Sequence, residues 1–190
     1  MHISISCVKT FFAIVALPHY LCYKIASKQV RYLIDSDLRI IDNRGGNGMM
    51  MTLTFNKYYR NIFYSRLKAN FILTKVLKML LPSNNTFEVH TEIIGEGIRF
   101  SHPFATILNA KSIGKNFSFR NNLTVGNKID GAVDAIPIIG DNVYVGANVC
   151  IIGKIRIGDN VIIGAGAVVI KDVPSNCIIA GNPAKIIKRL

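Results

Sequence analysis

Residues 137–170 read PIIGDNVYVGANVCIIGKIRIGDNVIIGAGAVVI, and an apolar residue recurs in this stretch at every sixth position. The lead positions are Ile139, Val145, Ile151, Ile157, Ile163 and Val169. A second apolar column follows the first by four residues: Val143, Val149, Ile155, Val161 and Ala167. Neither the helical period of 3.6 nor the strand period of 2 produces such columns. A hexapeptide repeat is typical of a β-helix, a solenoid whose coils contact only their neighbours.

The same interval appears upstream, at Ile107, Ile113, Phe119 and Val125, and again at Ile94 and Phe100. Three six-residue units make one triangular coil, so residues 87–190 are predicted to form a single β-helix domain of about five coils with a C-terminal tail. Glycine follows four of the lead residues and accepts turn geometry that a Cβ would resist. An antiparallel sandwich is the alternative, but it requires both columns to arise by coincidence. The periodicity does not set the hand of the solenoid.

The six-residue interval breaks twice. Between Phe100 and Ile107 it is seven, with the extra residue in the stretch 101–104. Between Val125 and Ile139 it is fourteen, two more than two repeats, and residues 127–135 form a polar loop that contains glycine. Insertions in a solenoid map to loops, and such loops often carry the functional site.

His102 lies in the first break, where a side chain is expected to point out of the regular stack into a groove. Histidine is the usual general base near neutral pH. His102 is therefore a candidate catalytic base. The alternative is a turn histidine with a structural or solvated role.

The first part of the chain has a different character. The sequence holds 23 Lys and Arg against 11 Asp and Glu, a net charge of +12, and residues 1–86 alone carry +9. We expect this region to be helical, with one helix in the apolar stretch 3–26, a loop at 43–48 and a second helix over about 57–81. The first stretch is too interrupted for a membrane span. It either packs on the solenoid or lies in a membrane surface, with residues 1–31 making the contact.

Other partners are disfavoured. No nucleic-acid motif accompanies the basic region, so no nucleic-acid partner is expected. The four cysteines lack metal-type spacing. The repeat region has only His90 and His102, too few for the three-histidine zinc site of β-helical carbonic anhydrases, so no metal is expected. No signal peptide is evident at the start of the chain. We expect a cytoplasmic protein, with a peripheral position on the inner face of the membrane as the alternative.

From Glu88 onward the sequence resembles the hexapeptide acyltransferases of the serine acetyltransferase branch, and more narrowly the bacterial polysaccharide-biosynthesis O-acetyltransferases. Five blocks carry the resemblance: residues 94–98 followed by His102, 124–127, 137–143, 163–169 and 180–185. Two stretches of the first half, 17–21 and 60–67, are also similar to that branch. The resemblance implies a left-handed parallel β-helix, assembled as a homotrimer with sites between neighbouring subunits and preceded by an α-helical N-terminal region.

The resemblance also implies a reaction and its site residues. His102 matches the base that takes a proton from an acceptor hydroxyl, which then attacks acetyl-CoA directly in a ternary complex. Glu88 is the candidate carboxylate partner of His102, although this chain has one residue fewer before Ile94 than the family pattern. Coenzyme A is expected along small-residue turns and a terminal lysine, at Gly146, Ala147, Gly164, Ala165 and Lys185.

One departure from the family pattern concerns the acceptor. Serine acetyltransferases carry an Arg-His pair before the proline of the later block, whereas Ala135 and Ile136 precede Pro137 here. Neither side chain can bind a carboxylate. We therefore expect a saccharide acceptor, free or linked to a nucleotide or lipid, in bacterial surface polysaccharide biosynthesis. A serine O-acetyltransferase of cysteine biosynthesis and a non-catalytic trimeric scaffold are the alternatives.

Overall fold

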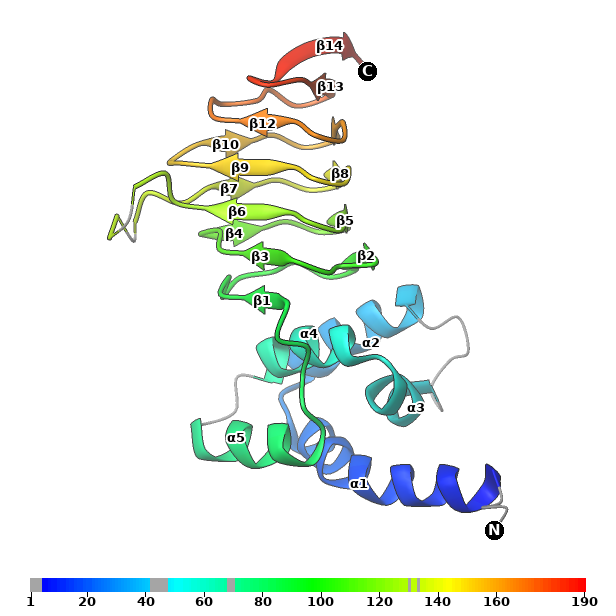
Figure 1. Cartoon of the computed structure of the whole chain (residues 1–190). Helices are drawn as coiled ribbons and strands as arrows, with labels where there is room; N and C mark the ends of the chain where they lie inside the picture. Colours follow the sequence, from blue (N-terminus) through cyan, green and yellow to red (C-terminus); the bar gives the residue numbers. More distant parts are fainter. Residues whose placement is uncertain (1–4, 42–47, 68–70, 130, 133) are drawn as a thin grey trace. The chain divides into compact units, whose positions relative to one another are not determined.

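A computed structural model of the chain describes residues 5–41, 48–67, 71–129, 131–132 and 134–190. The chain divides into two compact units, residues 1–85 and residues 86–190. The described part of the first unit is helical, and the second is a solenoid of short stacked strands (Figure 1).

The described residues of the first unit form five helices: α1 (Ile5–Ile25), α2 (Lys28–Ile41), α3 (Gly48–Phe55), α4 (Lys57–Leu67) and α5 (Phe71–Leu80). Local signals fix two of the starts. Ser27 Oγ accepts a hydrogen bond from the backbone N–H of Val30 ahead of α2, and Asn56 Oδ1 accepts one from the N–H of Tyr59 at the start of α4. Both are N-cap contacts, which satisfy amide groups that the first helical turn leaves without partners.

The core of the helical unit joins apolar and charged side chains. Its largest fully buried residues are Ile34, Leu53, Tyr59, Ile62, Phe63 and Leu77. The buried guanidinium of Arg60 donates to the carbonyl groups of Leu53 and Thr54 at the end of α3. Arg66 makes a buried ion pair with Asp37 of α2, with an Nε–Oδ2 distance of 3.0 Å. These charged groups connect α2, α3 and α4 through hydrogen bonds of defined geometry, which apolar packing alone does not provide.

The helical region was predicted in outline and differs in detail. Over the single helix expected at about 57–81 the structure describes two helices, α4 ending at Leu67 and α5 beginning at Phe71, and residues 68–70 lie outside the described residues. Helices α2 and α3 were not predicted, and of the expected loop at 43–48 only Gly48, the first residue of α3, lies inside the described residues. Among the described residues, no helix combines enough length with enough apolar character to cross a bilayer.

The second unit confirms the predicted β-helix. Its strands stack into three sheets, of which the five-stranded sheet has the order β1-β3-β6-β9-β12, the three-stranded sheet β10-β7-β4 and the six-stranded sheet β14-β13-β11-β8-β5-β2. All pairings are parallel except that of β13 with β14. The strands are β1 (Phe87–Val89), β2 (Arg99–Ser101), β3 (Thr106–Leu108), β4 (Ser112–Ile113), β5 (Ser118–Arg120), β6 (Thr124–Gly126), β7 (Ile138–Ile139), β8 (Tyr144–Val145), β9 (Cys150–Ile152), β10 (Arg156–Ile157), β11 (Val161–Ile163), β12 (Val168–Val169), β13 (Cys177–Ala180) and β14 (Lys185–Arg189).

The interior of the solenoid follows the lead column. Val145, Ile151 and Ile163 are fully buried, as the six-residue interval predicts. The first coils are filled by aromatic rings instead, with the ring centroids of Phe87 and Phe119 5.7 Å apart. Phe100 joins this cluster, 6.0 Å from Phe119. Larger side chains therefore occupy the interior where the stack begins.

One lead position was misassigned. Ile107 is 38% exposed, whereas its neighbour Leu108 is fully buried and pairs with Val125. The second break was also misread. Val125 and Ile139 lie on consecutive faces of one coil, so the connection between them holds eight residues more than one repeat rather than two more than two repeats.

Asparagines form a ladder along one edge of the solenoid, between the three-stranded and six-stranded sheets. Asn116, Asn142, Asn160 and Asn176 each adopt a positive φ, between 55° and 59°. The side-chain amide of each donates to the next, with nitrogen–oxygen distances of 2.8 to 3.0 Å. Asparagine tolerates this left-handed conformation better than other side chains, and the stacked amides satisfy one another.

Candidate functional site

His102 occupies an insertion in the solenoid. Leu108 follows Phe100 by eight positions, whereas Val125 follows Phe119 by six, although the two pairs stack on each other. The corner between β2 and β3 therefore holds two additional residues, and the following connection to Ile113 is one residue short. Two residues added at one corner and one missing at the next give the single extra residue that the sequence interval shows.

Backbone hydrogen bonds identify the inserted residues. Gly166 N–H donates to the carbonyl of Ala147, Asn148 N–H to that of Asn121, and Asn122 N–H to that of Phe104. Phe104 thus stands at the corner position that Asn121 and Ala147 hold in later coils. His102 and Pro103 are consequently the two additional residues. The bulge predicted from the sequence therefore contains His102, the candidate catalytic base.

The His102 turn is conformationally unusual. His102 has a φ of 52° and Ala105 a φ of 50°, while the equivalents of Ala105 in later coils are Asn122, Asn148 and Gly166. Non-glycine residues in this region cost about 1–3 kcal/mol each and cluster at functional sites. The imidazole of His102 is exposed in the single subunit, while the next residue, Pro103, is buried.

Glu88 contacts His90 rather than His102. Its Oε2 lies 2.8 Å from Nε2 of His90, and both side chains are about half exposed. Glu88 sits on β1 directly below Ile107 of β3, the strand that follows the His102 turn. The Glu88–His90 pair was missed by sequence reasoning, although the two-residue spacing in extended chain at the end of β1, which places both side chains on the same face, could have shown it.

Four of the five residues expected to bind coenzyme A, Gly146, Ala147, Gly164 and Ala165, share an edge of the solenoid with His102. This edge, where the chain passes from the six-stranded to the five-stranded sheet, is called the His102 edge below. Because Val145 pairs with Ile163, Ala147 and Ala165 stack on one another in successive coils along it. With about 4.8 Å per coil, Ala147 lies two coils, or about 10 Å, from the His102 corner.

The two glycines beside these alanines have a packing role. A Cβ on Gly146 would lie 2.6 Å from the backbone N of Ala165, and one on Gly164 would lie 2.9 Å from Cβ of Ala180. Neither position has room for a side chain. Ala165 itself is exposed and Ala147 is half-buried, so both remain accessible from outside the stack.

Lys185 lies at the end of the solenoid. It begins β14, which folds back antiparallel on β13 and pairs Lys185 with Ala180. Its side chain is exposed. A cleft of about 140 Å³ beside it is lined by residues of β12, β14 and the segment between β12 and β13.

The loop after β6 leaves the solenoid at a different edge, between the five-stranded and three-stranded sheets (Figure 1). Its described residues include Asn127, whose side-chain amide donates to the carbonyl of Ile129, and Ala135, whose N–H donates to the carbonyl of Ala132. The structure therefore does not join this loop to His102 within one subunit.

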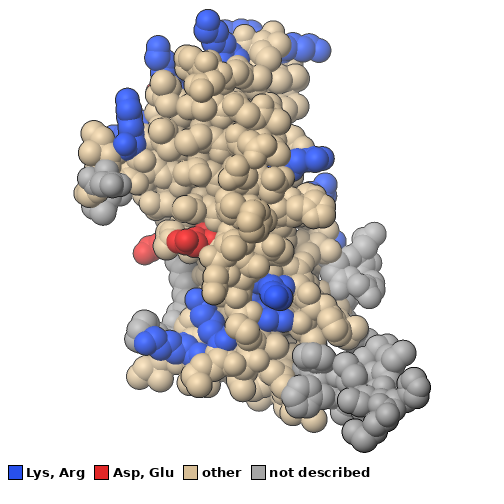
Figure 2. All heavy atoms as spheres, viewed as in Figure 1, with Lys and Arg blue, Asp and Glu red and all other residues tan. Residues whose placement is uncertain are grey.

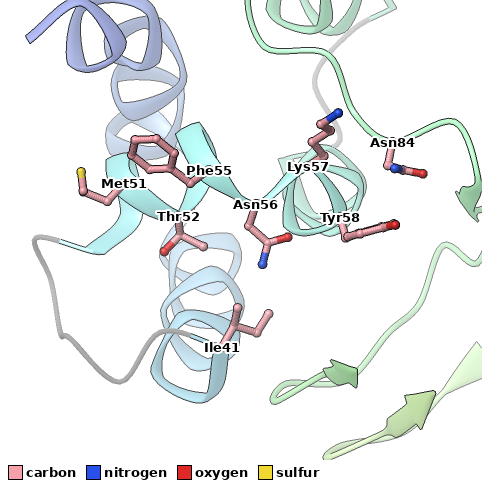
Figure 3. Close-up of a pocket in the computed structure, with 8 residues that line it drawn as sticks. All are labelled: Ile41, Met51, Thr52, Phe55, Asn56, Lys57, Tyr58 and Asn84. Carbon is pink, nitrogen blue, oxygen red and sulfur yellow. The ribbon is translucent and has the colours of Figure 1, made fainter. Parts of the chain in front are cut away.

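The helical unit contains a larger cleft, of about 590 Å³, between the end of α2, helix α3 and the start of α4 (Figure 3). None of its eight described lining residues is His, Cys, Asp or Glu. The Asn56 amide oxygen is already used as the cap of α4. In the described part of the chain, no three His, Cys, Asp or Glu side chains gather in a way that could hold a metal ion.

Comparison with known proteins gives the same fold and a family. The sequence model of the protein family "Bacterial transferase hexapeptide (six repeats)" matches residues 136–171. The crystal structure of serine acetyltransferase (CysE) from Neisseria gonorrhoeae in complex with serine is 30% identical to this chain. It superposes with a TM-score of 0.67 over 84% of this chain and 69% of that one.

Curated relatives match the solenoid half. Serine acetyltransferase 3 of Arabidopsis thaliana is 42% identical over 95 residues, which are 50% of this chain and 24% of the relative. A protein of Escherichia coli K12 named as a colanic acid biosynthesis acetyltransferase, WcaB, is 40% identical over 95 residues, 49% of this chain and 57% of the relative. The chain thus spans about a quarter to just over half of these relatives' lengths.

Proposed function

Because this chain belongs to the hexapeptide-repeat acetyltransferases of serine acetyltransferase type, we propose that it transfers the acetyl group of acetyl-CoA to an acceptor hydroxyl, with His102 as general base. The observation that supports this most directly is the inserted corner. His102 interrupts an otherwise regular edge, and the small residues Ala147 and Ala165 follow it along the same edge.

The proposed chemistry needs no covalent enzyme intermediate. The imidazole of His102 accepts the proton of the acceptor hydroxyl while the hydroxyl oxygen attacks the thioester carbonyl carbon. The C–S bond then breaks, and the proton passes from the imidazolium to the leaving sulfur. Holding donor and acceptor together supplies much of the rate gain, and a positioned base contributes about 10²–10⁴-fold.

Coenzyme A is proposed to lie along the His102 edge, with its pantetheine arm against Ala147 and Ala165. Gly146 and Gly164 contribute indirectly, because they allow adjacent coils to approach closely at this edge. Lys185, at the end of the stack, is proposed to meet the nucleotide phosphates. A homotrimer is proposed because His102 is exposed in the single subunit and needs a second wall to exclude water.

Glu88 remains the proposed carboxylate partner of His102. In this role it would exchange its contact with His90 for one with the imidazole of His102, fixing the tautomer and stabilising the imidazolium. The 2.8 Å bond to His90 makes this the least supported residue of the proposed site.

Serine is the first candidate acceptor, because most of the relatives described above are serine acetyltransferases and one was crystallised with serine. This ranking reverses the expectation of a saccharide. A saccharide hydroxyl is the second candidate, favoured by the WcaB relative and by Ala135 and Ile136, which offer no cation for an amino-acid carboxylate.

The test is thiol release from acetyl-CoA with serine and a panel of sugars, nucleotide sugars and oligosaccharides. His102→Asn should lower the rate about 10²–10⁴-fold without changing the fold, because the side chain is exposed. His90→Asn is the matched control, an exposed histidine on the same solenoid, and should leave the rate within about threefold. If Glu88 serves His102, Glu88→Gln lowers the rate where His90→Asn does not. An undiminished rate in His102→Asn refutes the assignment of the base, and no turnover with any acceptor favours a scaffold.

A further inference from the structure

Helix α1 carries an apolar stripe on its solvent side. Its exposed residues, between 46% and 83% accessible, are Ile14, Leu17, Leu21 and Ile25. At 100° per residue these positions fall within an arc of about 80°. Ala16 and His19, both fully buried, face the opposite direction into the helical unit. The helix is thus apolar on its exposed side, where a surface helix is normally polar.

Helix α5, which contacts α1, repeats this pattern. Its exposed apolar residues, between 43% and 83% accessible, are Ile72, Val76, Met79 and Leu80. They lie within an arc of about 100°, and the buried Leu77 lies outside it. We call the eight exposed residues of α1 and α5 the apolar face. Exposed apolar side chains gathered on two helices that contact each other indicate an interaction site.

The charges around the apolar face are basic. Lys24 of α1 and Lys75 and Lys78 of α5 are exposed beside it, and neither helix contains an acidic residue. The described carboxylates of the helical unit are engaged elsewhere, since Asp37 pairs with Arg66 and Asp35 accepts from the Tyr23 hydroxyl. On the side shown in Figure 2, the coloured charges over the described helices are blue, and the red carboxylates belong to the solenoid.

We propose that the apolar face docks the protein on an anionic membrane surface, with α1 and α5 lying at the headgroup level. An apolar stripe bordered by lysine is the pattern of a helix that inserts its apolar residues and pairs its lysines with anionic lipid. A two-fold contact with a second copy fits less well. It would bring Lys24, Lys75 and Lys78 of both copies into one interface with no carboxylate on either helix to neutralise them.

Tryptophan fluorescence offers a direct test, because the chain contains no tryptophan. Met79→Trp places a single probe in the apolar face at a residue 83% exposed. Vesicles of phosphatidylcholine mixed with phosphatidylglycerol should shift its emission to the blue, and brominated acyl chains should quench it. Ile187→Trp on β14, at a residue 67% exposed, is the matched control and should show neither change. An unaltered Met79→Trp spectrum overturns the proposal.

Sedimentation with vesicles separates the apolar and basic contributions. Leu21→Gln/Ile25→Gln should weaken binding at least tenfold. Lys75→Gln/Lys78→Gln should weaken it about 25-fold, since each lysine near an anionic surface contributes about fivefold. The control Lys154→Gln/Lys171→Gln changes two exposed solenoid lysines and should bind as wild type. Raising ionic strength from about 0.1 M to about 1 M should also release the protein.

Two further outcomes would overturn the proposal. Equal binding to phosphatidylcholine with and without the anionic lipid removes the basic contribution. A change of molecular mass in Leu21→Gln/Ile25→Gln with unchanged vesicle binding shows that a second copy covers the apolar face. Acetyl transfer to a soluble acceptor should be the same in all these variants, so failure of membrane docking is distinguishable from failure of the proposed activity.

Discussion

Gly146→Ala should destabilise the solenoid, because the coil above leaves no space for a side chain. The added Cβ would meet the backbone N of Ala165 at 2.6 Å and its Cα at 2.8 Å. These atoms cannot swing away as a side chain would. The coils are held together here by the Gly146 N–H, which donates to the carbonyl of Ile163 at 2.8 Å, so any separation lengthens that bond.

The expected cost combines two effects. Overpacking by one methyl costs about 1–3 kcal/mol, and weakening one backbone hydrogen bond adds about 0.5–1.5 kcal/mol. The sum is about 1.5–4.5 kcal/mol. At roughly 4 °C per kcal/mol for a domain of this size, the melting temperature should fall by about 6–18 °C. Differential scanning calorimetry on the full chain measures it.

Two other glycines of the solenoid provide controls. Gly126 has nothing within 4 Å of its built Cβ and no positive φ, so Gly126→Ala should be neutral or raise stability slightly. Gly166 is equally open but has a φ of 71°, so Gly166→Ala should cost only the left-handed backbone penalty, about 1–2 kcal/mol. The reasoning is refuted if Gly146→Ala melts within about 2 °C of Gly126→Ala. A folded Gly146→Ala with a raised KM for acetyl-CoA would instead assign this glycine to the cofactor.

Two further predictions concern stability. Burial lowers the pKa of His19 below its usual 6.5, so the unfolded chain binds a proton more readily. Stability should therefore fall as pH drops from about 6.5 toward the lowered pKa, and His19→Gln should lose this dependence in urea titrations at several pH values. In the asparagine ladder, Asn160→Gly removes hydrogen bonds to Asn142 and Asn176 and should cost about 1–3 kcal/mol. Asn160→Ala, forced to a φ near 55°, should cost about 1–2 kcal/mol more by calorimetry.

The sequence predicts the solenoid well at positions where burial requires an apolar side chain. Val145 and Ile163 are buried in stacked strands because every coil needs an apolar residue at the same place. The prediction was wrong at Ile107, because two added residues at one corner and one missing at the next leave a net slip of one. The spacing between apolar residues in the sequence records only the net change in length. The backbone hydrogen bonds between coils are needed to separate the insertion from the deletion.

Contacts between exposed side chains were harder to predict. Nothing in the spacing of apolar residues indicates that Glu88 meets His90, because both side chains point away from the core. The asparagine ladder could have been found, since the motif Gly-Asp-Asn recurs at 140–142 and 158–160. The division between α4 and α5 has no such signal, because apolar residues continue through both helices.

The topology separates two segments that we propose to act on the acceptor. His102 stands at the edge between the six-stranded and five-stranded sheets, while the loop that ends at Ala135 and Ile136 leaves the edge between the five-stranded and three-stranded sheets. The five-stranded sheet lies between the two edges, so the loop and His102 start from opposite sides of that sheet within a subunit. The proposed homotrimer would remove this separation by placing the loop edge of one subunit beside the His102 edge of the next. Residues 135 and 136 would then influence the acceptor that a neighbouring subunit acetylates, and their lack of charge becomes relevant to the choice between serine and a sugar.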